Sequence, residues 1–204
     1  MTEESSNARL EAFCDGVFAF ALTLLIVDVK LPATEGIGSS AELWHALQHL
    51  TPAVFAFLLS FTIILITWVN HHGALKLVRT ASASFIFANG FLLLTVVFTP
   101  FPTSLLGDFL LTDHAGPAVF LYNAVLAVQA IAWLFVFRTA LTSHLATNEH
   151  AAITLRTSGR NGYFALGLYS VLAVAGLWFP LPAAIITTAS WVFWLTLAIR
   201  LKHA

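Results

Sequence analysis

The stretch that decides the fold is FCDGVFAFALTLLIVDVKL, residues 13–31. It is almost continuously apolar, and at 1.5 Å per helical residue it is long enough to cross the hydrocarbon core of a bilayer. One carboxylate, Asp15, interrupts it near its beginning. Because a charged side chain inside a membrane helix costs about 2.5–3.5 kcal/mol on insertion scales, an acid at this depth requires a partner or a function.

The composition of the whole chain is that of a membrane protein. Of its 204 residues, 59% are hydrophobic and 9% are charged, and the mean hydropathy is +0.87. A soluble domain usually carries about 25% charged residues. We therefore expect an all-α integral membrane protein with a single domain, residues 1–204, and the lipid bilayer as its solvent. The single cysteine, Cys14, excludes an intrachain disulfide and a cysteine-cluster metal site.

Six apolar segments are predicted to span the membrane, each close to the ~20 residues that a bilayer core requires. Their approximate bounds are 11–31, 50–69, 85–106, 117–139, 163–179 and 181–201. The sequence FPLP, residues 179–182, separates the last two, and its prolines break the helix, so a short final helical hairpin is expected. The stretches between the other spans are predicted to be linkers, at 32–43, 70–84, 107–116 and 143–161.

The basic residues predict the orientation of the chain. With six crossings, eight of the nine lysines and arginines fall on one side of the membrane, and only Lys30 falls on the other. The eight are Arg9, Lys76, Arg79, Arg138, Arg156, Arg160, Arg200 and Lys202. Because cytoplasmic loops carry an excess of lysine and arginine, both termini are expected in the cytoplasm. The first apolar run is too long for the core of a signal peptide, so no cleaved leader is expected.

The first span presents two different faces when it is drawn at 100° per residue. Phe20, Leu24 and Val27 form one narrow apolar line, with Thr23 at its edge. Asp15 lies about 140° away from Phe20. From periodicity alone the apolar line could also be ordinary packing, and Asp15 could be either a structural pair or a direct ion or proton site.

A motif runs through the beginning of this span. Arg9, Phe13, Asp15 and Ala19 give the pattern R-x-x-x-F-C-D-x-x-x-A. It resembles the R-x-x-x-F-S-D-x-x-x-A signature of the transmembrane protein 175 family, the endolysosomal potassium channels and their bacterial relatives. Cys14 stands where that family usually has serine. The histidine pair that ends the second span, and PFPT followed by LLGD at the end of the third, are also similar to the family.

The resemblance covers about residues 9–201 and implies both a fold and a function. In that family the first helix of each repeat lines the pore, single-repeat bacterial members form homotetramers, and an apolar constriction replaces a carbonyl filter. By position from the aspartate, the constriction falls on Phe20, where the family more often has isoleucine or leucine. Leu24 and Val27 are further layers, and Thr23 matches a pore-facing polar position. The implied protein is a potassium-selective passive channel of the bacterial inner membrane.

The residues themselves are compatible with such a pore. The chain contains no TVGYG-like sequence, so a carbonyl filter is not expected. A ring of apolar side chains can gate by dewetting, and it discriminates between ions by the cost of removing their water. Asp28, near the outer end of the first span, is either a solvated interfacial charge or one member of an acidic ring that concentrates cations.

His71 and His72 end the second span at the depth of Asp15. One of them is predicted to hydrogen-bond the carboxylate, with Arg9 close by; the alternatives are a plain interfacial histidine and a metal ligand. A metal site needs three or four ligands, whereas adjacent histidines point about 100° apart and Asp15 is the one acid nearby. We therefore expect no metal and no cofactor; the family resemblance implies potassium as the permeant ion.

Other polar groups within the spans have ordinary structural interpretations. Asn89, Asn123 and Gln129 are expected to hydrogen-bond between helices, and the six tryptophans lie mostly near span ends, as in an aromatic belt. No hydrolase, kinase or nucleotide motif is found, so neither an enzyme nor a nucleic-acid partner is expected. Two other functions remain open. One is a proton-coupled transporter or proton leak pathway that uses Asp15 and His71, and the other is a non-conducting membrane assembly protein.

Overall fold

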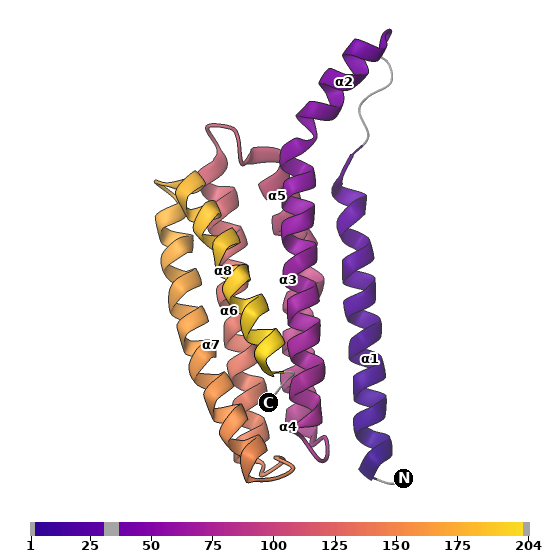
Figure 1. Cartoon of the computed structure of the whole chain (residues 1–204), viewed down its shortest axis with the longest axis vertical. Helices are drawn as coiled ribbons and strands as arrows, with labels where there is room; N and C mark the ends of the chain where they lie inside the picture. Colours follow the sequence, from indigo (N-terminus) through magenta and orange to yellow (C-terminus); the bar gives the residue numbers. More distant parts are fainter. Residues whose placement is uncertain (1–2, 31–36, 202–204) are drawn as a thin grey trace.

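The computed structural model describes residues 3–30 and 37–201, with side chains for 7–27, 29–30 and 37–196. It is helical almost throughout, and most of the helices run along one long axis (Figure 1). The α-helices are α1 (Glu3–Leu24), α2 (Ser40–His49), α3 (Thr51–Lys76), α4 (Ala83–Phe98), α5 (Pro100–Phe109), α6 (Ala115–Thr142), α7 (Glu149–Gly176) and α8 (Pro180–Leu201). A short 3-10 helix, η1 (Leu25–Asp28), continues α1.

Four stretches of the described chain are long and apolar enough to cross a membrane: Asn7–Val27, Thr51–Lys76, Ala83–Phe109 and Ala115–Thr142. They coincide with the first four predicted spans and confirm an all-helical membrane protein. The fifth predicted span is the second half of α7, and the sixth coincides with α8. The total of six crossings stays a prediction.

All four predicted linkers contain helical residues, and in two of them a helix begins well before the next predicted span. The linker at 32–43 runs into α2, where Ser39 Oγ accepts from the Glu42 amide at 3.3 Å and the Glu42 carboxylate accepts from the Gly38 amide at 2.7 Å. The linker at 143–161 contains the first half of α7, where the Asn148 side chain accepts from the Ala151 amide at 2.8 Å. Such caps start helices in polar sequence, where hydropathy gives no signal.

The third predicted span is not one continuous helix. α4 ends at Phe98 and α5 begins at Pro100. Proline lacks an amide hydrogen and its ring disturbs the preceding turn, so it is tolerated where a helix begins but breaks one that is already under way. The first span has its predicted length but lies nearer the N-terminus than 11–31: it covers Asn7–Val27, and α1 gives way to η1 at Leu25.

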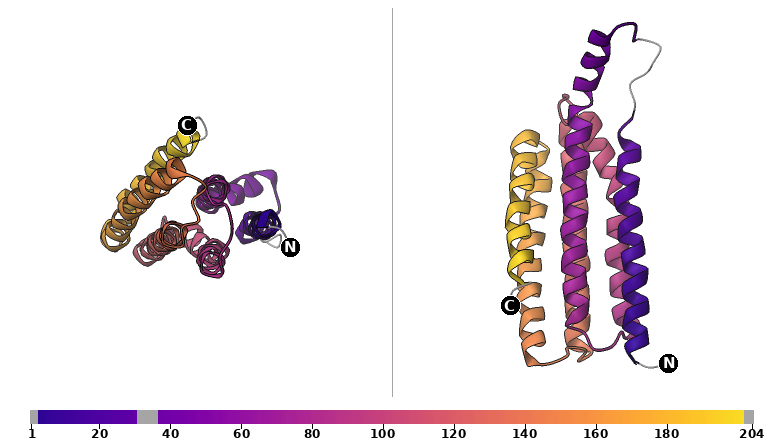
Figure 2. Two further views of the ribbon diagram at one scale, coloured as in Figure 1. Left: turned by 90° about the horizontal axis from the view of Figure 1, so that it is seen from below. Right: turned by 45° about the vertical axis from the view of Figure 1, so that its right-hand side comes forward.

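α1 stands at one edge of the bundle and packs against α3 and α4 (Figure 2). α6 and α7 lie side by side, and α7 and α8 form the hairpin that the FPLP turn predicts (Figure 1). Two apolar cores result. One joins α1, α3, α4 and α6, and the other joins α3, α5, α6, α7 and α8.

The beginnings of α1 and α7 and the ends of α3 and α6 meet at the end of the molecule where the N-terminus lies (Figure 1). The loops there are tied together, because the Arg79 amide donates to the Leu145 carbonyl and the Thr147 amide donates to the Leu77 carbonyl, both at 2.9 Å. The Asn7 side chain adds a bond of 2.9 Å to a third carbonyl of this region. We call this the basic end because it gathers Arg9, Lys76, Arg79, Arg138 and Arg156.

Candidate functional site

The inward face of α1 is a row of buried side chains at helical spacing: Leu10, Cys14, Phe18, Ala21 and Leu25. Cys14 and Ala21 have no exposed surface, and the whole row belongs to the core shared with α3, α4 and α6. Cys14 therefore packs as a small apolar residue.

The opposite face of α1 has no partner among the described residues. We call it the outer stripe, and it consists of Arg9, Phe13, Gly16, Phe20, Thr23 and Val27, all exposed. Phe13, Phe20 and Val27 are 64%, 59% and 71% exposed. Leu24 is half-buried at the edge of the outer stripe, and Ala19 of the motif is exposed beside it. Three of these apolar side chains are large, so the surface is one that water disfavours and that lipid or another subunit would cover.

The outer stripe contains one hydroxyl in its apolar part. Thr23 Oγ1 donates to the Phe20 carbonyl of its own helix at 2.8 Å. Because this bond uses the single hydroxyl hydrogen, the lone pairs of the oxygen remain available on the exposed face. Asp28, the candidate for an outer acidic ring, ends η1, but its side chain lies outside the described residues.

Asp15 is bonded to α3 through a residue that was not among the predicted site residues. Trp68 Nε1 donates to Asp15 Oδ1 at 2.7 Å. One turn nearer the basic end, His72 Nδ1 lies 2.7 Å from Glu11 Oε1. This distance is short enough for an ion pair, but the geometry of the contact is not that of a hydrogen bond. The Trp68 and His72 rings stack, with centroids 6.3 Å apart. We call these two contacts the α1–α3 ladder.

The predicted pairing of Asp15 with a histidine was therefore wrong. His71 is buried and its Nε2 lies 2.8 Å from Asn89 Oδ1, on α4. The Asn89 amide nitrogen donates to the Phe85 carbonyl, so its oxygen must accept, and His71 carries its proton on Nε2. Because His71 and His72 are adjacent on α3, their side chains point about 100° apart. His72 lies beside Glu11, whereas His71 faces the core, where its ring packs on Phe18 of α1 with centroids 5.4 Å apart.

The position of Arg9 also differs from the expectation. It is exposed on the outer stripe, and no ion pair joins it to Asp15 in the part of the chain that the structure describes. Six residues separate the two on α1, which places them about 120° apart around the helix. The signal that could have located the true partners is spacing. Glu11 and Asp15 are four residues apart, as are Trp68 and His72, so each pair shares one helical face.

Two of the three amides within the spans bond between helices as predicted. Asn89 accepts from His71 of α3, and Asn123 Oδ1 accepts from Thr187 Oγ1 of α8 at 2.8 Å. For Gln129 the prediction was wrong, since its Nε2 is buried and has no hydrogen-bond partner among the described residues.

The family of the chain follows from its matches to known proteins. Residues 9–100 match the family described as Endosomal/lysosomal potassium channel TMEM175. The chain is also 40% identical, over 141 residues that make up 69% of each protein, to a potassium channel of Chamaesiphon minutus. The chain belongs to the TMEM175 family. It is therefore related to ion channels and not to enzymes.

Two further matches concern the fold and the range of the TMEM175 family. The crystal structure of a lysosomal potassium-selective channel TMEM175 homolog from Chamaesiphon minutus superposes with a TM-score of 0.83 at 31% identity, covering 95% of this chain and 98% of that one. The endosomal/lysosomal proton channel TMEM175 of Gallus gallus is 34% identical over 87 residues, which are 40% of this chain and 17% of that protein.

Proposed function

We propose that the chain forms a homotetrameric, passive potassium channel whose pore is lined by the outer stripe of α1. The observation that carries the proposal is the outer stripe itself. It is a continuous, largely apolar face on an edge helix in a chain whose relatives are named potassium channels. Phe20 forms the narrowest ring, Leu24 and Val27 form further layers, and both termini lie in the cytoplasm.

Side chains on the outer stripe suit a narrow ion path better than contact with lipid. Gly16 leaves open space at the level of the fourth turn of α1, where a Cβ would meet no atom within 4 Å. The Thr23 oxygen offers lone pairs to a cation that has lost part of its hydration shell. Potassium loses water at a lower cost than sodium, so an apolar constriction favours potassium to a modest degree.

Asp15 has a structural role in this proposal. Its carboxylate faces α3 and accepts from Trp68, so it holds the pore helix against its neighbour and does not line the narrow path. Phe13, Ala19 and Arg9 of the motif lie on or beside the outer stripe and are available for contacts between subunits.

A second candidate function is proton conduction, which is favoured by the name of the chicken relative and by the titratable pair of Glu11 and His72 in the α1–α3 ladder. A relay from Asp15 to His71 has no support from the geometry. Asp15 accepts from Trp68, whereas His71 donates to Asn89 of α4 inside the core.

The decisive experiment is ion flux into proteoliposomes under a potassium gradient, combined with imaging of the purified particle. A channel gives a fourfold axis along α1 and a potassium flux faster than any carrier. A flux that requires a pH gradient would replace the proposal with proton coupling. A particle without fourfold symmetry that carries no flux would indicate an assembly protein instead.

A further inference from the structure

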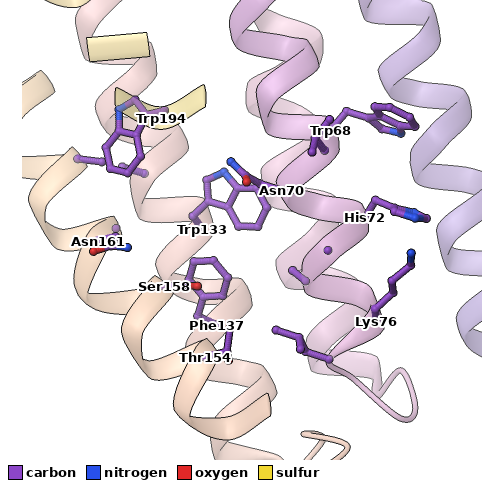
Figure 3. A pocket seen from close by; sticks show the side chains of 17 residues that line it. Trp68, Asn70, His72, Lys76, Trp133, Phe137, Thr154, Ser158, Asn161 and Trp194 are labelled. Carbon is purple, nitrogen blue, oxygen red and sulfur yellow. The ribbon is translucent and has the colours of Figure 1, made fainter. Parts of the chain in front are cut away.

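A cavity of about 610 Å³ lies between α3, α6, α7 and the last described turns of α8, on the side of α3 that faces away from α1 (Figure 3). Its volume falls in the range of about 300–1,000 Å³ that is typical of small-molecule sites. A smaller cavity of about 90 Å³ continues from it, away from the basic end. We call them the outer chamber and the inner chamber. They share the lining residues Asn70, Ala130, Trp133, Ala165 and Trp194.

The aromatic walls of the chambers are fixed by contacts within the protein. Trp133 stacks on Phe137 with centroids 5.2 Å apart and planes at 20°. Trp194 Nε1 donates to the Tyr169 hydroxyl at 2.9 Å, and that hydroxyl lies 3.0 Å from Ser190 Oγ. Of the six tryptophans in the chain, four line one chamber or both: Trp68, Trp133, Trp191 and Trp194. The expected aromatic belt therefore accounts for only part of this set.

The inner chamber contains two hydrogen-bond donors that have no acceptor. Gln129 and Trp191 are only 6% and 9% exposed, and neither Gln129 Nε2 nor Trp191 Nε1 has a partner among the described residues. Both groups can only donate. Leaving a buried donor unsatisfied is unfavourable, so a molecule that supplies oxygen acceptors at this place is stabilised.

The outer chamber adds neutral polar groups but no charge. Asn70, Ser158 and Asn161 are half-buried and have no hydrogen-bond partner in the described part of the chain (Figure 3). The two lining residues that can carry a charge are His72 and Lys76, and their side chains lie on the side of α3 toward α1 (Figure 3). A charged ligand would therefore be buried without a counter-ion, which is unfavourable.

We propose that the two chambers bind an uncharged amphipathic molecule. Its apolar body lies against Trp133 and Trp194, and its carbonyl or ester oxygens accept from Gln129 and Trp191. A membrane quinone and a neutral ester lipid share this chemistry. α3 connects the site to the pore helix, because Asn70 lines the chambers while Trp68 and His72 form the α1–α3 ladder. An effect of the ligand on ion flux rests on the proposed function, whereas binding does not.

The test is native mass spectrometry of the purified protein in detergent with two probes, 2-methyl-1,4-naphthoquinone and monocaprin. At least one probe is expected to bind saturably, with one molecule per chain, and the probe that binds identifies the source. Gln129→Leu and Trp191→Phe each remove one donor and should weaken binding about fivefold. Val128→Leu is the matched control, since Val128 is exposed beside Gln129, lines neither chamber and should leave binding unchanged.

Two results would overturn this inference. One is the absence of saturable binding with either probe. The other is binding to Gln129→Leu that is as tight as to the unaltered protein, since the Gln129 donor would then take no part in holding the ligand. Flux measured on the same preparations separates the two proposals. A conducting protein that binds neither probe contradicts the ligand site alone, and a protein that binds a probe but does not conduct contradicts the channel alone.

Discussion

Phe20 and Asp15 are five residues apart on α1, yet their surroundings differ completely. Phe20 is 59% exposed on the outer stripe, whereas Asp15 is half-buried and accepts a hydrogen bond from α3. A substitution at Phe20 should therefore alter ion conductance and selectivity, and a substitution at Asp15 or its partner should alter the thermal stability of the protein.

Phe20→Ala is expected to raise single-channel conductance and to shift the reversal potential toward weaker discrimination against sodium. The reason is that loss of four rings widens the narrowest point and admits ions that keep more of their water. Planar-bilayer recordings under potassium and sodium gradients measure both quantities. Phe87→Ala serves as the control, because Phe87 is 80% exposed on α4. Unchanged recordings for Phe20→Ala would move the constriction to another position.

Trp68→Phe should lower the melting temperature of the detergent-solubilised protein by about 3–6 °C, which corresponds to about 1.5 kcal/mol for a chain of this size. The substitution keeps the aromatic ring but removes the N–H group that Asp15 accepts from. Asp15→Ala should act in the same direction, whereas Asp15→Asn retains an oxygen acceptor and should be milder. Trp178→Phe, at a side chain that is 69% exposed, should melt normally.

Ion selectivity separates this assignment from a pore role for the acid. If Asp15→Ala assembles and melts like the unaltered protein but loses conduction, the carboxylate lines the ion path and its structural assignment fails.

At the scale of elements, α3 and α5 approach so closely that only glycine fits between them. A Cβ added at Gly107 would lie 2.9 Å from Ala53 Cα and 3.3 Å from Ala53 Cβ. Small residues permit such contacts between membrane helices. The backbone on the other side cannot move without shifting a whole helix, so this crossing should tolerate no larger residue.

Gly107→Ala is accordingly expected to destabilise the fold by about 1–3 kcal/mol, the usual range for overpacking. Gly167→Ala is the matched control on α7, where an added Cβ meets no atom within 4 Å and alanine gains helix propensity of up to about 1 kcal/mol. Melting of the two variants in the same detergent should therefore move in opposite directions. A Gly107→Ala protein as stable as the control would show that the α3–α5 crossing is looser than described.

The parts of the structure that could be predicted from the sequence are those that hydrophobicity alone decides. The long apolar helices were predicted because lipid requires about 20 apolar residues, and α2 was missed because its start depends on the side-chain caps of Ser39 and Glu42. The apolar part of the outer stripe could be predicted, because it depends only on the rotation of 100° per residue within one helix. The partner of Asp15 could not, because it depends on how α3 is rotated and placed along its axis, and one helical turn separates Trp68 from His72.

At the scale of the whole molecule, the outer stripe must be covered by something, and the proposal assigns it to three other copies of the chain. Thr23→Cys provides a direct test, because the natural cysteine, Cys14, is fully buried. Mild oxidation of the purified variant should yield covalent dimers on a non-reducing gel, since stripes that converge on one axis bring equivalent residues together. Phe87→Cys, exposed on α4, should remain monomeric. If Phe87→Cys forms covalent dimers and Thr23→Cys does not, α4 and not α1 lies at the axis.

The α1–α3 ladder has a mechanical consequence for a pore of this kind. Sliding α1 by one turn, about 5.4 Å, toward the basic end would put Asp15 opposite His72 and leave Trp68 without its acceptor. Any shorter slide stretches both contacts at once. Rotation of α1 and α3 as one unit stretches neither. The pore should therefore open by rotation of α1 together with α3 and not by sliding of α1 along its own axis. Spin labels on α1 and α3 of one chain should keep their separation, while labels on α1 of opposite chains move apart.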